Sequence, residues 1–548
     1  MNGAAAMVKC LEKEGVTVAF GYPGATICPF YDELAKSSVR HILVRQEQNA
    51  GHAAGAWGRM TGKPGVCIAT SGPGATNLLT ALATAYMDSA PLVAITGQVS
   101  SELLGRDAFQ EADITGAAAS FVKHSFLVKH PEELPRVMRE AFYIAGTGRK
   151  GPVLVDVPVD VQNGAVGRFH YPEAVSIRGY NPTLRGNQLQ IRRVVAAMDE
   201  ARRPVICAGG GVFGSLARRQ VRLLAERCRI PVACTMMGLG ALPTEHPLNL
   251  GMLGSQGGAL ANEAIRCSDL LIILGARVGD RAVTQSGILE KGTRVVHIDI
   301  DPAEIRKNVE AGIPLVGDLA QVLDQILEEG PRPHGDVWTE GLHLPKDDAA
   351  AFGLVREGFV NPRRLVWAIS ARMEPEGIYT ADVGQNQIWS ARNCLIREGR
   401  FLTSGGMGTM GYSIPAAIGA ALAAPGHQAV AVCGDGSFQM QMMELATLVR
   451  EQIPVKVFVL RNGCLGLIRE IQDERYGGNR MAVDLSGSPD MTALAGAYGI
   501  PAARLDRDEE IDGAVRRAFD TPGPFLTECA VWPGEDTHQL LPEKEEQL

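Results

Sequence analysis

Two apolar stretches in the last third of the chain limit most narrowly how it can fold. Residues 430–433 run into Gly434, Asp435 and Gly436, and residues 455–460 run into an Arg-Asn pair. Between them, residues 438–451 space their apolar side chains as one face of a helix does. The stretch therefore predicts a β-α-β unit with two parallel strands and a right-handed crossover.

Asp435 and Asn462 would then follow two neighbouring strands at one edge of the sheet, where open α/β sheets bind ligands. A carboxylate, an amide oxygen and a loop carbonyl suit Mg²⁺ that takes its other ligands from phosphate and water. A helix that begins near Ser437 would direct its N–H groups towards an anion. A tight turn with an ordinary surface Asp is the alternative, and the Asn after the next strand favours the metal site.

The rest of the chain has the α/β pattern, in which short β-branched runs are followed by Gly-rich turns and Ala-rich helical stretches. Its 548 residues are enough for about three domains. We place them at residues 1–165, 186–340 and 361–535, joined by linkers and followed by a tail at 536–548. The tail is polar, and we expect it to be solvated or to order over a site.

Bulk properties exclude several classes of protein. A net charge of −8 gives no support for binding nucleic acid or an anionic membrane. No uninterrupted apolar run reaches the ~18 residues of a membrane span. The eleven cysteines include no Cys-x-x-Cys, and the polar start lacks a signal-peptide core, so we expect reduced thiols and a cytoplasmic location.

Three motifs stand out in the first predicted domain. Glu47 ends an apolar strand and precedes a helix of small residues, which favours shielding from water over the salt bridge usual at a strand end. Residues 70–77 read Thr-Ser-Gly-Pro-Gly-Ala-Thr-Asn, a strand end with a Gly-rich turn that caps a helix. Residues 107–111 read Asp-Ala-Phe-Gln-Glu, which by default is a solvated loop.

Together these motifs resemble the catalytic, or large, subunit of acetohydroxyacid (acetolactate) synthases, a family that depends on thiamin diphosphate (ThDP). The family signature is Gly-Asp-Gly followed some 25 residues later by Asn-Asn, and Arg461 replaces the first Asn here. The resemblance covers nearly the whole chain. It implies an α/β fold of three doubly wound parallel-sheet domains that bind the pyrimidine, FAD and the diphosphate in turn.

The resemblance also implies roles for single residues. Asp435 and Asn462 would bind Mg²⁺ through side chains and Cys464 through its backbone carbonyl, and Glu47 would hydrogen-bond the aminopyrimidine ring and so activate ThDP. The residues expected to line the ThDP site are Gly24, Pro73, Asn77, Gly384, Gln385, Asn386, Gly408, Met410, Gly436, Ser437, Leu465, Gly466, Leu467 and Ile468.

FAD is implied by motifs in the middle domain that follow the order of the family. The residues expected to bind it are Arg149, Gly210, Gly211, Met252, Leu253, Gly275, Arg277, Asp280, Asp299, Ile300 and Asp318. Two departures weaken the match, because Ser255-Gln256 replaces Met-His, and Val278-Gly279 interrupts the family's Arg-Phe-Asp-Asp-Arg.

The activity that the resemblance implies is decarboxylation of pyruvate and transfer of the remaining two carbons to a second 2-ketoacid. The product would be 2-acetolactate for branched-chain amino-acid biosynthesis. Phe109 and Gln110 would line the substrate pocket, and Arg281 would receive the carboxylate of the second ketoacid. Ile471 replaces a Trp that favours 2-ketobutyrate in many relatives, so we expect a weaker preference between pyruvate and 2-ketobutyrate.

In this family the catalytic Glu and the metal site meet across the interface of a homodimer, dimers can pair into tetramers, and biosynthetic members bind a separate regulatory subunit. Four alternatives stay open. A catabolic acetolactate synthase would work without FAD. Glyoxylate carboligase lacks the catalytic Glu, which is present here as Glu47. An oxidoreductase would turn over NAD(P)H without thiamin, and a non-catalytic binding protein would not need both an intact metal motif and Glu47.

Overall fold

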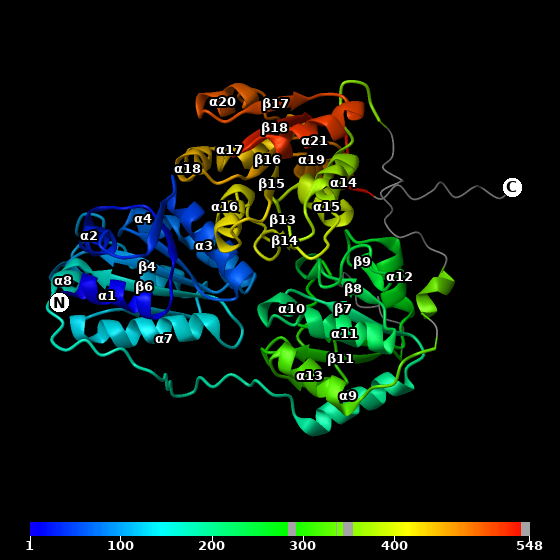
Figure 1. The fold of residues 1–548 in the computed structure, drawn as a ribbon, viewed down its shortest axis with the longest axis horizontal. Coiled ribbons are helices and arrows are strands. Elements are labelled where there is room, and N and C mark those ends of the chain that lie inside the picture. Colours follow the sequence, from blue (N-terminus) through cyan, green and yellow to red (C-terminus); the bar gives the residue numbers. More distant parts are fainter. Residues whose placement is uncertain (283–291, 336, 343–354, 539–548) are drawn as a thin grey trace.

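The computed structural model describes residues 1–282, 292–335, 337–342 and 355–538. These residues form three lobes, each built on one six-stranded sheet. Figure 1 shows the first lobe in blue and cyan, the second in green and the third from yellow to red. Neighbouring strands in all three described sheets run parallel, which confirms the predicted α/β fold with three parallel sheets.

The first sheet has the strand order β2-β1-β3-β4-β6-β5. Its strands are β1 (Val18–Gly21), β2 (Arg40–Leu43), β3 (Gly65–Ala69), β4 (Leu92–Gln98), β5 (His124–Leu127) and β6 (Pro152–Pro158). Its helices are α1 (Gly3–Lys13), α2 (Cys28–Leu34), α3 (Glu47–Thr61), α4 (Pro73–Asn77), α5 (Leu79–Met87), α6 (Ile114–Ala118), α7 (Leu134–Gly146) and α8 (Val159–Asn163). Along β3, Cys67 and Ala69 enter one core and Val66 and Ile68 the other. Both faces of the sheet are therefore buried, as its unbroken apolar strands predict.

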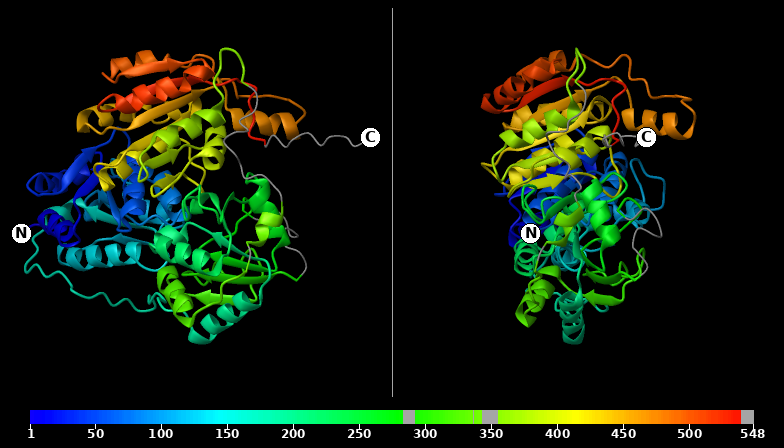
Figure 2. Two further views of the ribbon diagram at one scale, coloured as in Figure 1. Left: turned by 45° about the vertical axis from the view of Figure 1, so that its right-hand side comes forward. Right: turned by 90° about the vertical axis from the view of Figure 1, so that its right-hand side faces the viewer.

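The second sheet has the order β12-β11-β10-β7-β8-β9. Its strands are β7 (Pro204–Ala208), β8 (Val232–Cys234), β9 (Asn249–Met252), β10 (Leu270–Leu274), β11 (Arg294–Asp299) and β12 (Ile313–Val316). Its helices are α9 (Gln188–Glu200), α10 (Gly211–Gly214), α11 (Arg218–Cys228), α12 (Ala259–Cys267) and α13 (Leu319–Glu329). The segment between α8 and α9 runs along the outside of the first two lobes (Figures 1 and 2).

The third sheet has the order β14-β13-β15-β16-β18-β17. Its strands are β13 (Ile378–Ala381), β14 (Arg400–Leu402), β15 (Ala429–Gly434), β16 (Lys456–Arg461), β17 (Ala502–Leu505) and β18 (Phe525–Ala530). Its helices are α14 (Pro362–Arg372), α15 (Gln385–Asn393), α16 (Ser413–Ala423), α17 (Asp435–Gln439), α18 (Leu445–Glu451), α19 (Gly466–Arg475), α20 (Met491–Ala497) and α21 (Ile511–Asp520). Short 3₁₀ helices lie at Ala25–Ile27, Ser101–Leu103, Pro131–Glu133, Met236–Gly238, Trp338–Leu342, Met442–Glu444 and Asp508–Glu510.

The β-α-β unit at 430–461 forms as predicted, since β15 and β16 pair in parallel. The helix between them differs from the prediction, because it is divided into α17, a 3₁₀ turn and α18. Gln441 lies at the break and is fully buried. Its side chain donates to Asp382 Oδ2 and accepts from the Ile414 N–H, both at 2.8 Å. These hydrogen bonds to residues distant in sequence take the place of the continuous helix that the apolar spacing predicts.

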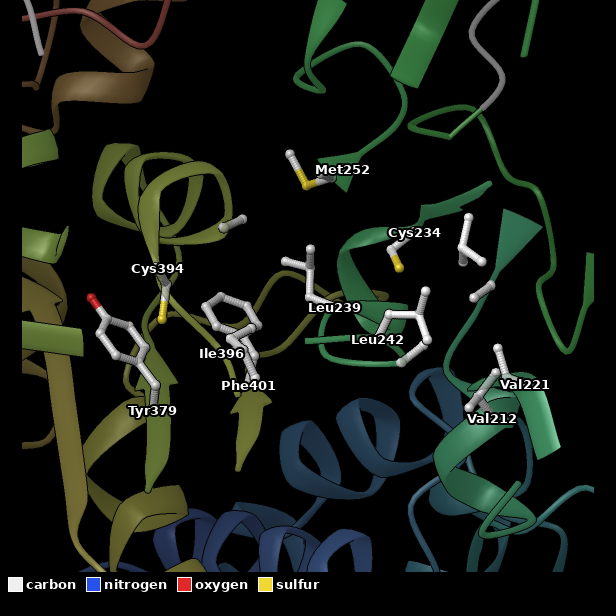
Figure 3. Close-up of a cluster of buried hydrophobic side chains, with 14 of the residues drawn as sticks. Val212, Val221, Cys234, Leu239, Leu242, Met252, Tyr379, Cys394, Ile396 and Phe401 are labelled. Carbon is white, nitrogen blue, oxygen red and sulfur yellow. The ribbon is translucent and has the colours of Figure 1, made fainter. Parts of the chain in front are cut away.

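Two apolar contacts join the lobes. Helix α3 of the first lobe lies against α16 of the third, with a glycine, Gly419, facing Ala53. Leu239 and Leu242 of the second lobe share a core with Ile396 and Phe401 of the third (Figure 3). The ligand-binding edges of the sheets are thus held relative to one another by buried surface. In the described part of the chain, no helix is both long and apolar enough for a membrane crossing.

Candidate active site

Asp435 and Asn462 come together where β15 and β16 end side by side. Asp435 is the first residue of α17, and its side chain is 1% exposed. Its two oxygens accept from the N–H of Gly436 at 3.0 Å and of Gly463 at 2.7 Å, which ties it to the loop after β16. Burial raises the pKa of the Asp435 carboxyl, an effect that a nearby cation would oppose.

The loop after β16 brings neutral oxygens to this carboxylate. Asn462 donates from Nδ2 to Gln385 Oε1 at 2.9 Å and accepts at Oδ1 from the Cys464 N–H at 3.1 Å. No cluster of three or more His, Cys, Asp or Glu side chains placed for a metal occurs among the described residues. A cation here would therefore need amide, carbonyl, phosphate and water oxygens besides Asp435, a set that suits Mg²⁺.

A cavity opens beside the carboxylate, and helices α15, α17 and α19 all begin at its wall. The first turn of a helix presents unpaired N–H groups and the positive end of the helix dipole, so these helix starts favour a phosphate. The cavity is lined by Val383, Gly384, Gln385, Asn386, Trp389, Met410, Gly434, Asp435, Gly436, Ser437, Leu460, Asn462, Cys464, Leu465, Gly466, Leu467 and Ile468. All predicted metal ligands and ten of the fourteen predicted ThDP residues are in this set.

The cavity has features that fit a bound organic group. A Cβ added to Gly466 would lie 1.8 Å from Gln385 Oε1, so only glycine allows this close approach. A Cβ added to Gly436 would lie 3.5 Å from Met410 Cε, which places the Met410 side chain at the cavity wall. The buried Oδ1 of Asn386 has no hydrogen-bond partner among the described residues, so it is available to a ligand donor.

Glu47 and its neighbours form a separate patch on the first lobe. Glu47 is the first residue of α3, is partly buried, and accepts at Oε2 from Asn77 Nδ2 at 2.9 Å. Pro73 and Asn77 are exposed on α4, and a Cβ added to Gly24 would lie 2.5 Å from Thr70 Cβ below the same turn. These four predicted residues line no part of the Asp435 cavity, whose lining comes from residues 383–468.

The Phe-Gln loop lies next to the Glu47 patch. The backbone and Cβ of Gln110 are within 3.0 Å of the position that a Cβ on Gly72 would take, so the loop packs against the Gly72-Pro73 turn. Gln110 has a φ of 59°, and the Phe109 side chain is 88% exposed. The Phe109 ring is therefore open to solvent in the single chain.

A second cavity lies where the three lobes meet. Eight of the predicted FAD residues line it: Arg149, Gly210, Gly211, Gly275, Arg277, Asp299, Ile300 and Asp318. Arg59, Lys150 and Arg400 add positive charge, and burial raises the pKa of Asp299 to about 6. Arginines for a pyrophosphate and carboxylates for hydroxyl groups fit a dinucleotide.

Three predicted FAD residues and one substrate residue lie outside this cavity lining. Met252 and Leu253 are buried in the second lobe, 3% and 5% exposed. Asp280 and Arg281 are almost fully exposed, with their side chains 3.9 Å apart. Arg281 also lines no part of the Asp435 cavity.

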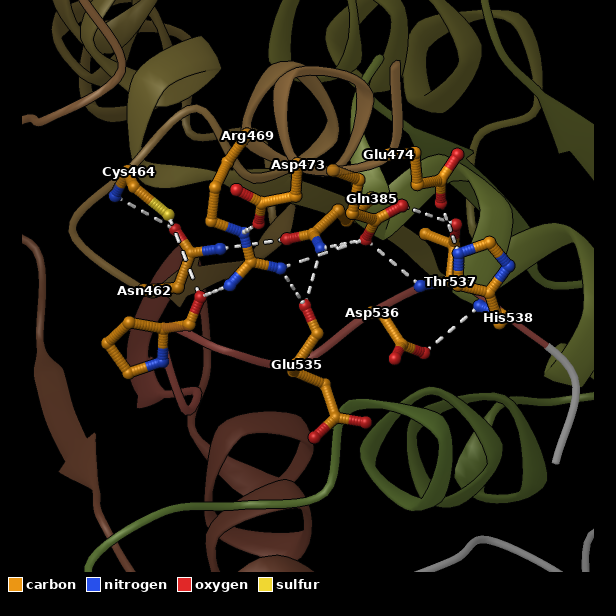
Figure 4. Close-up of polar contacts among 12 residues, drawn as sticks. Gln385, Asn462, Cys464, Arg469, Asp473, Glu474, Glu535, Asp536, Thr537 and His538 are labelled. Carbon is orange, nitrogen blue, oxygen red and sulfur yellow. Dashed lines mark hydrogen bonds and ion pairs between the residues drawn. The ribbon is translucent and has the colours of Figure 1, made fainter. Parts of the chain in front are cut away.

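The end of the described chain is held beside the loop that carries Asn462 and Cys464 (Figure 4). Glu470 accepts from Gln385 Nε2, and from the N–H and hydroxyl of Thr537 at 3.0 and 2.8 Å. Arg469 donates to the backbone oxygens of Pro533 and, at 2.6 Å, Glu535. The segment through residue 538 therefore packs on α19, and residues 539–548 of the predicted tail lie outside the described residues.

Sequence reasoning missed some residues at these sites and left one departure unexplained. Asp88 binds the loop that carries Met410, but it follows an Ala-rich helix with no motif around it. Glu470 lies in none of the motifs named in the sequence analysis. Arg461, which replaces the family's Asn, donates to the buried Glu528 at 2.6 Å, so its charge is used inside the third lobe.

The chain is similar to known proteins along most of its length. Models of thiamine pyrophosphate enzymes match over three segments: the N-terminal TPP binding domain at 1–117, the central domain at 191–326 and the C-terminal TPP binding domain at 382–529. A probable acetolactate synthase large subunit from Methanocaldococcus jannaschii is 43% identical, covering 99% of this chain and 94% of its own length. An acetolactate synthase from Arthrospira platensis is 41% identical over 99% and 96%. An acetolactate synthase large subunit from Corynebacterium glutamicum is 42% identical over 94% and 84%.

Proposed function

Because the chain belongs to the acetolactate synthase large-subunit family of thiamine pyrophosphate enzymes, we propose that it makes 2-acetolactate from two 2-ketoacids. Pyruvate loses CO₂, and the remaining two carbons join a second pyruvate to give 2-acetolactate. Addition to 2-ketobutyrate instead would give the homologue with one more CH₂ group. The observation that carries this proposal is the cavity at which three helices begin beside buried Asp435. Such a cavity suits a metal-bound diphosphate.

The residues of this cavity hold the coenzyme and the metal. Asp435, Asn462 and the Cys464 carbonyl take Mg²⁺, and the first turns of α15 and α19 receive the diphosphate. Met410 and Leu465 line the cavity next to Gly436 and would shield the bound coenzyme from water. When bound, thiamin diphosphate supplies a nucleophilic carbon and an electron sink for the loss of CO₂.

Glu47 would hold the proton that activates the coenzyme. Its Oε2 accepts from Asn77, which leaves Oε1 as the oxygen that could carry a proton towards the aminopyrimidine ring of the bound coenzyme. Asn77 thereby fixes the orientation of the carboxyl group. A carboxyl held by one amide has a defined direction for proton transfer, which general acid–base catalysis requires.

A second copy of the chain brings the Glu47 patch to the Asp435 cavity. Two observations support this: Glu47 is absent from the cavity lining within one chain, and Phe109, on the loop that packs against Gly72, is 88% exposed. A homodimer with two sites, alone or paired into a tetramer, follows. Phe109 and Gln110 would then line the substrate space, and Arg281 would bind the carboxylate of the second ketoacid.

FAD occupies the second cavity in this proposal, held by the eight lining residues named above. We also propose a separate regulatory subunit as a partner, because relatives of the chain are named large subunits. The eleven cysteines, all within the described residues, form no disulfide, which supports the proposed cytoplasmic location.

The decisive test is product analysis with pyruvate, with and without ThDP and Mg²⁺. We expect 2-acetolactate and CO₂ only when both are present, a loss of at least about 100-fold in kcat for Glu47→Gln, and a flavin spectrum for the purified protein. Turnover without thiamin, or a Glu47→Gln variant as active as the parent, would overturn the proposal. Strong selectivity for 2-ketobutyrate in competition would contradict the expectation drawn from Ile471.

A further inference from the structure

The loop at residues 403–411 is held by a helix from another lobe. It leads to Gly408 and Met410 and contains four glycines, at 405, 406, 408 and 411. Gly408 and Gly411 have φ values of 70° and 88°. Glycines leave a loop with much conformational freedom, so the position of Met410 depends on contacts that restrain the loop.

Helix α5 of the first lobe supplies such contacts at two points. Asp88, which ends the helix, accepts from the N–H of Gly406 at 2.8 Å and of Gly405 at 3.2 Å. One turn earlier, the Thr84 and Thr409 hydroxyls are 2.7 Å apart, and both residues are buried. The third lobe itself holds the far end of the loop, where Asp382 accepts from the Gly411 N–H at 3.0 Å.

Asp88 is poorly placed to stabilise its own helix. A carboxylate at the C-terminal end of a helix is repelled by the helix dipole, and burial raises the pKa of Asp88. Arg59, Arg277 and the two loop N–H groups offset that cost. Since the Asp88 carboxylate accepts hydrogen bonds from the N–H groups of residues 405 and 406, its charge stabilises the loop.

The same carboxylate also faces the second cavity. Asp88 lines it together with Arg59, Arg149 and Arg277. A Cβ on Gly406 would lie 2.9 Å from Arg277 Nη2 and 3.0 Å from Asp88 Oδ1, so the arginine and the carboxylate both lie against the loop at Gly406. A ligand that fills this cavity would therefore lie against the contacts that hold the loop and restrict its motion. A second ligand that needs the same loop arrangement would then lose less conformational entropy on binding.

We propose that Asp88 is a positioning residue that couples the two cavities: a dinucleotide at Arg277 and thiamin diphosphate at Met410 each strengthen the binding of the other. The ligands are those of the proposed function, on which this inference rests. The coupling is reciprocal, because binding at either site favours the same arrangement of residues 405–410.

The test is calorimetric titration of ThDP and Mg²⁺ into the full-length protein, stripped of flavin and then reloaded with FAD. For the parent protein we expect FAD to lower the Kd of ThDP. In Asp88→Asn, the amide still accepts one loop N–H but opposes the other. We expect the Kd of ThDP to rise about tenfold, the loss of one charged hydrogen bond, and its dependence on FAD to disappear.

Two further variants keep the test informative if Asp88→Asn folds poorly. Thr84→Val removes the hydroxyl that meets Thr409, and we expect weaker ThDP binding. Thr84→Ser keeps the hydroxyl, so we expect it to bind ThDP as the parent does. A general packing defect at this position would weaken ThDP binding in both variants. Asp520→Asn changes an exposed carboxylate on α21 in the same way and serves as the control.

The outcomes separate this inference from the proposed function. A parent protein that binds no ThDP with Mg²⁺ contradicts the proposed function. A parent that binds ThDP equally with and without FAD, or Asp88→Asn and Thr84→Val variants with parental Kd values and parental FAD dependence, overturns the coupling through Asp88 alone.

Discussion

At the scale of single residues, neighbouring amides and hydroxyls stabilise the buried carboxyl groups of this protein. Asp435 has two backbone N–H groups, and Asp156 has Thr96 at 2.6 Å and Gln98 at 3.0 Å. Asp435 follows the buried strand β15 and Asp156 lies within the buried strand β6, where solvent cannot stabilise a charge. The protonation of Asp156 and the proposed metal binding of Asp435 are therefore sensitive to isosteric changes.

Replacing Asp435 by Asn should weaken Mg²⁺-dependent ThDP binding by about 100-fold or more. This is more than the affinity lost when a residue that only supports a metal ligand is replaced. The Asn keeps the shape but removes the only carboxylate among the proposed ligands. Titration calorimetry measures the change, with the exposed Asp32→Asn as control. Equal affinity in the variant and the parent would exclude Asp435 as a ligand.

Asp156 should make stability depend on pH. Burial raises the pKa of its carboxyl from 3.8 to about 7. The folded state therefore binds the proton more tightly than the unfolded chain, so this contribution to stability is present below about pH 4 and lost as pH rises through 7.

In Asp156→Asn this titration is absent, and one hydrogen bond is lost because the Asn amide faces the Gln98 amide donor. We expect a cost of roughly 1–3 kcal/mol at pH 5 that becomes smaller at pH 8. Urea unfolding at both pH values measures it. A gap that stays constant or widens with pH would contradict the raised pKa.

At the scale of elements, close contact between helices decides where the lobes sit. A Cβ on Gly419 of α16 would lie 1.9 Å from the Ala53 carbonyl oxygen of α3, nearer than any atom can approach. The small residues that the sequence shows along α3 therefore have a structural use: they let the first and third lobes pack backbone to backbone.

Gly419→Ala should consequently destabilise the protein by about 1–3 kcal/mol, the usual cost of overpacking. Gly513→Ala is the matched control, since Gly513 lies in α21 with nothing within 4 Å of its added Cβ. There the change should be neutral or stabilise by up to ~1 kcal/mol. Thermal unfolding of both variants compares them, and equal effects would refute the close packing.

At the scale of the whole molecule, each proposed site is divided between two chains. If Glu47 comes from one copy and Asp435 from the other, Glu47→Gln and Asp435→Asn proteins are each inactive alone. Mixed dimers then contain one intact site and one site with both changes. With random exchange, activity should recover to about a quarter of the parental value, since half the dimers are mixed and half their sites are intact.

The two variants are unfolded and refolded together, and separately as controls, and the recovered activity is measured. Recovery near zero, with chain exchange verified by mass-tagged subunits, would place both residues of a site in one chain. The measurement is independent of the identity of the second ketoacid.

Much of the architecture could be predicted from local patterns, because a strand buried on both faces reads as an unbroken apolar run and a ligand-binding turn needs glycine. The β-α-β unit and the placement of Asp435 and Asn462 at one edge followed from this. The division of the helix after Asp435 could not be predicted, because it depends on Gln441 reaching Asp382 across the fold. Asp88 escaped prediction for the same reason: its partners lie more than 300 residues away and become neighbours only when α5 packs against the third lobe.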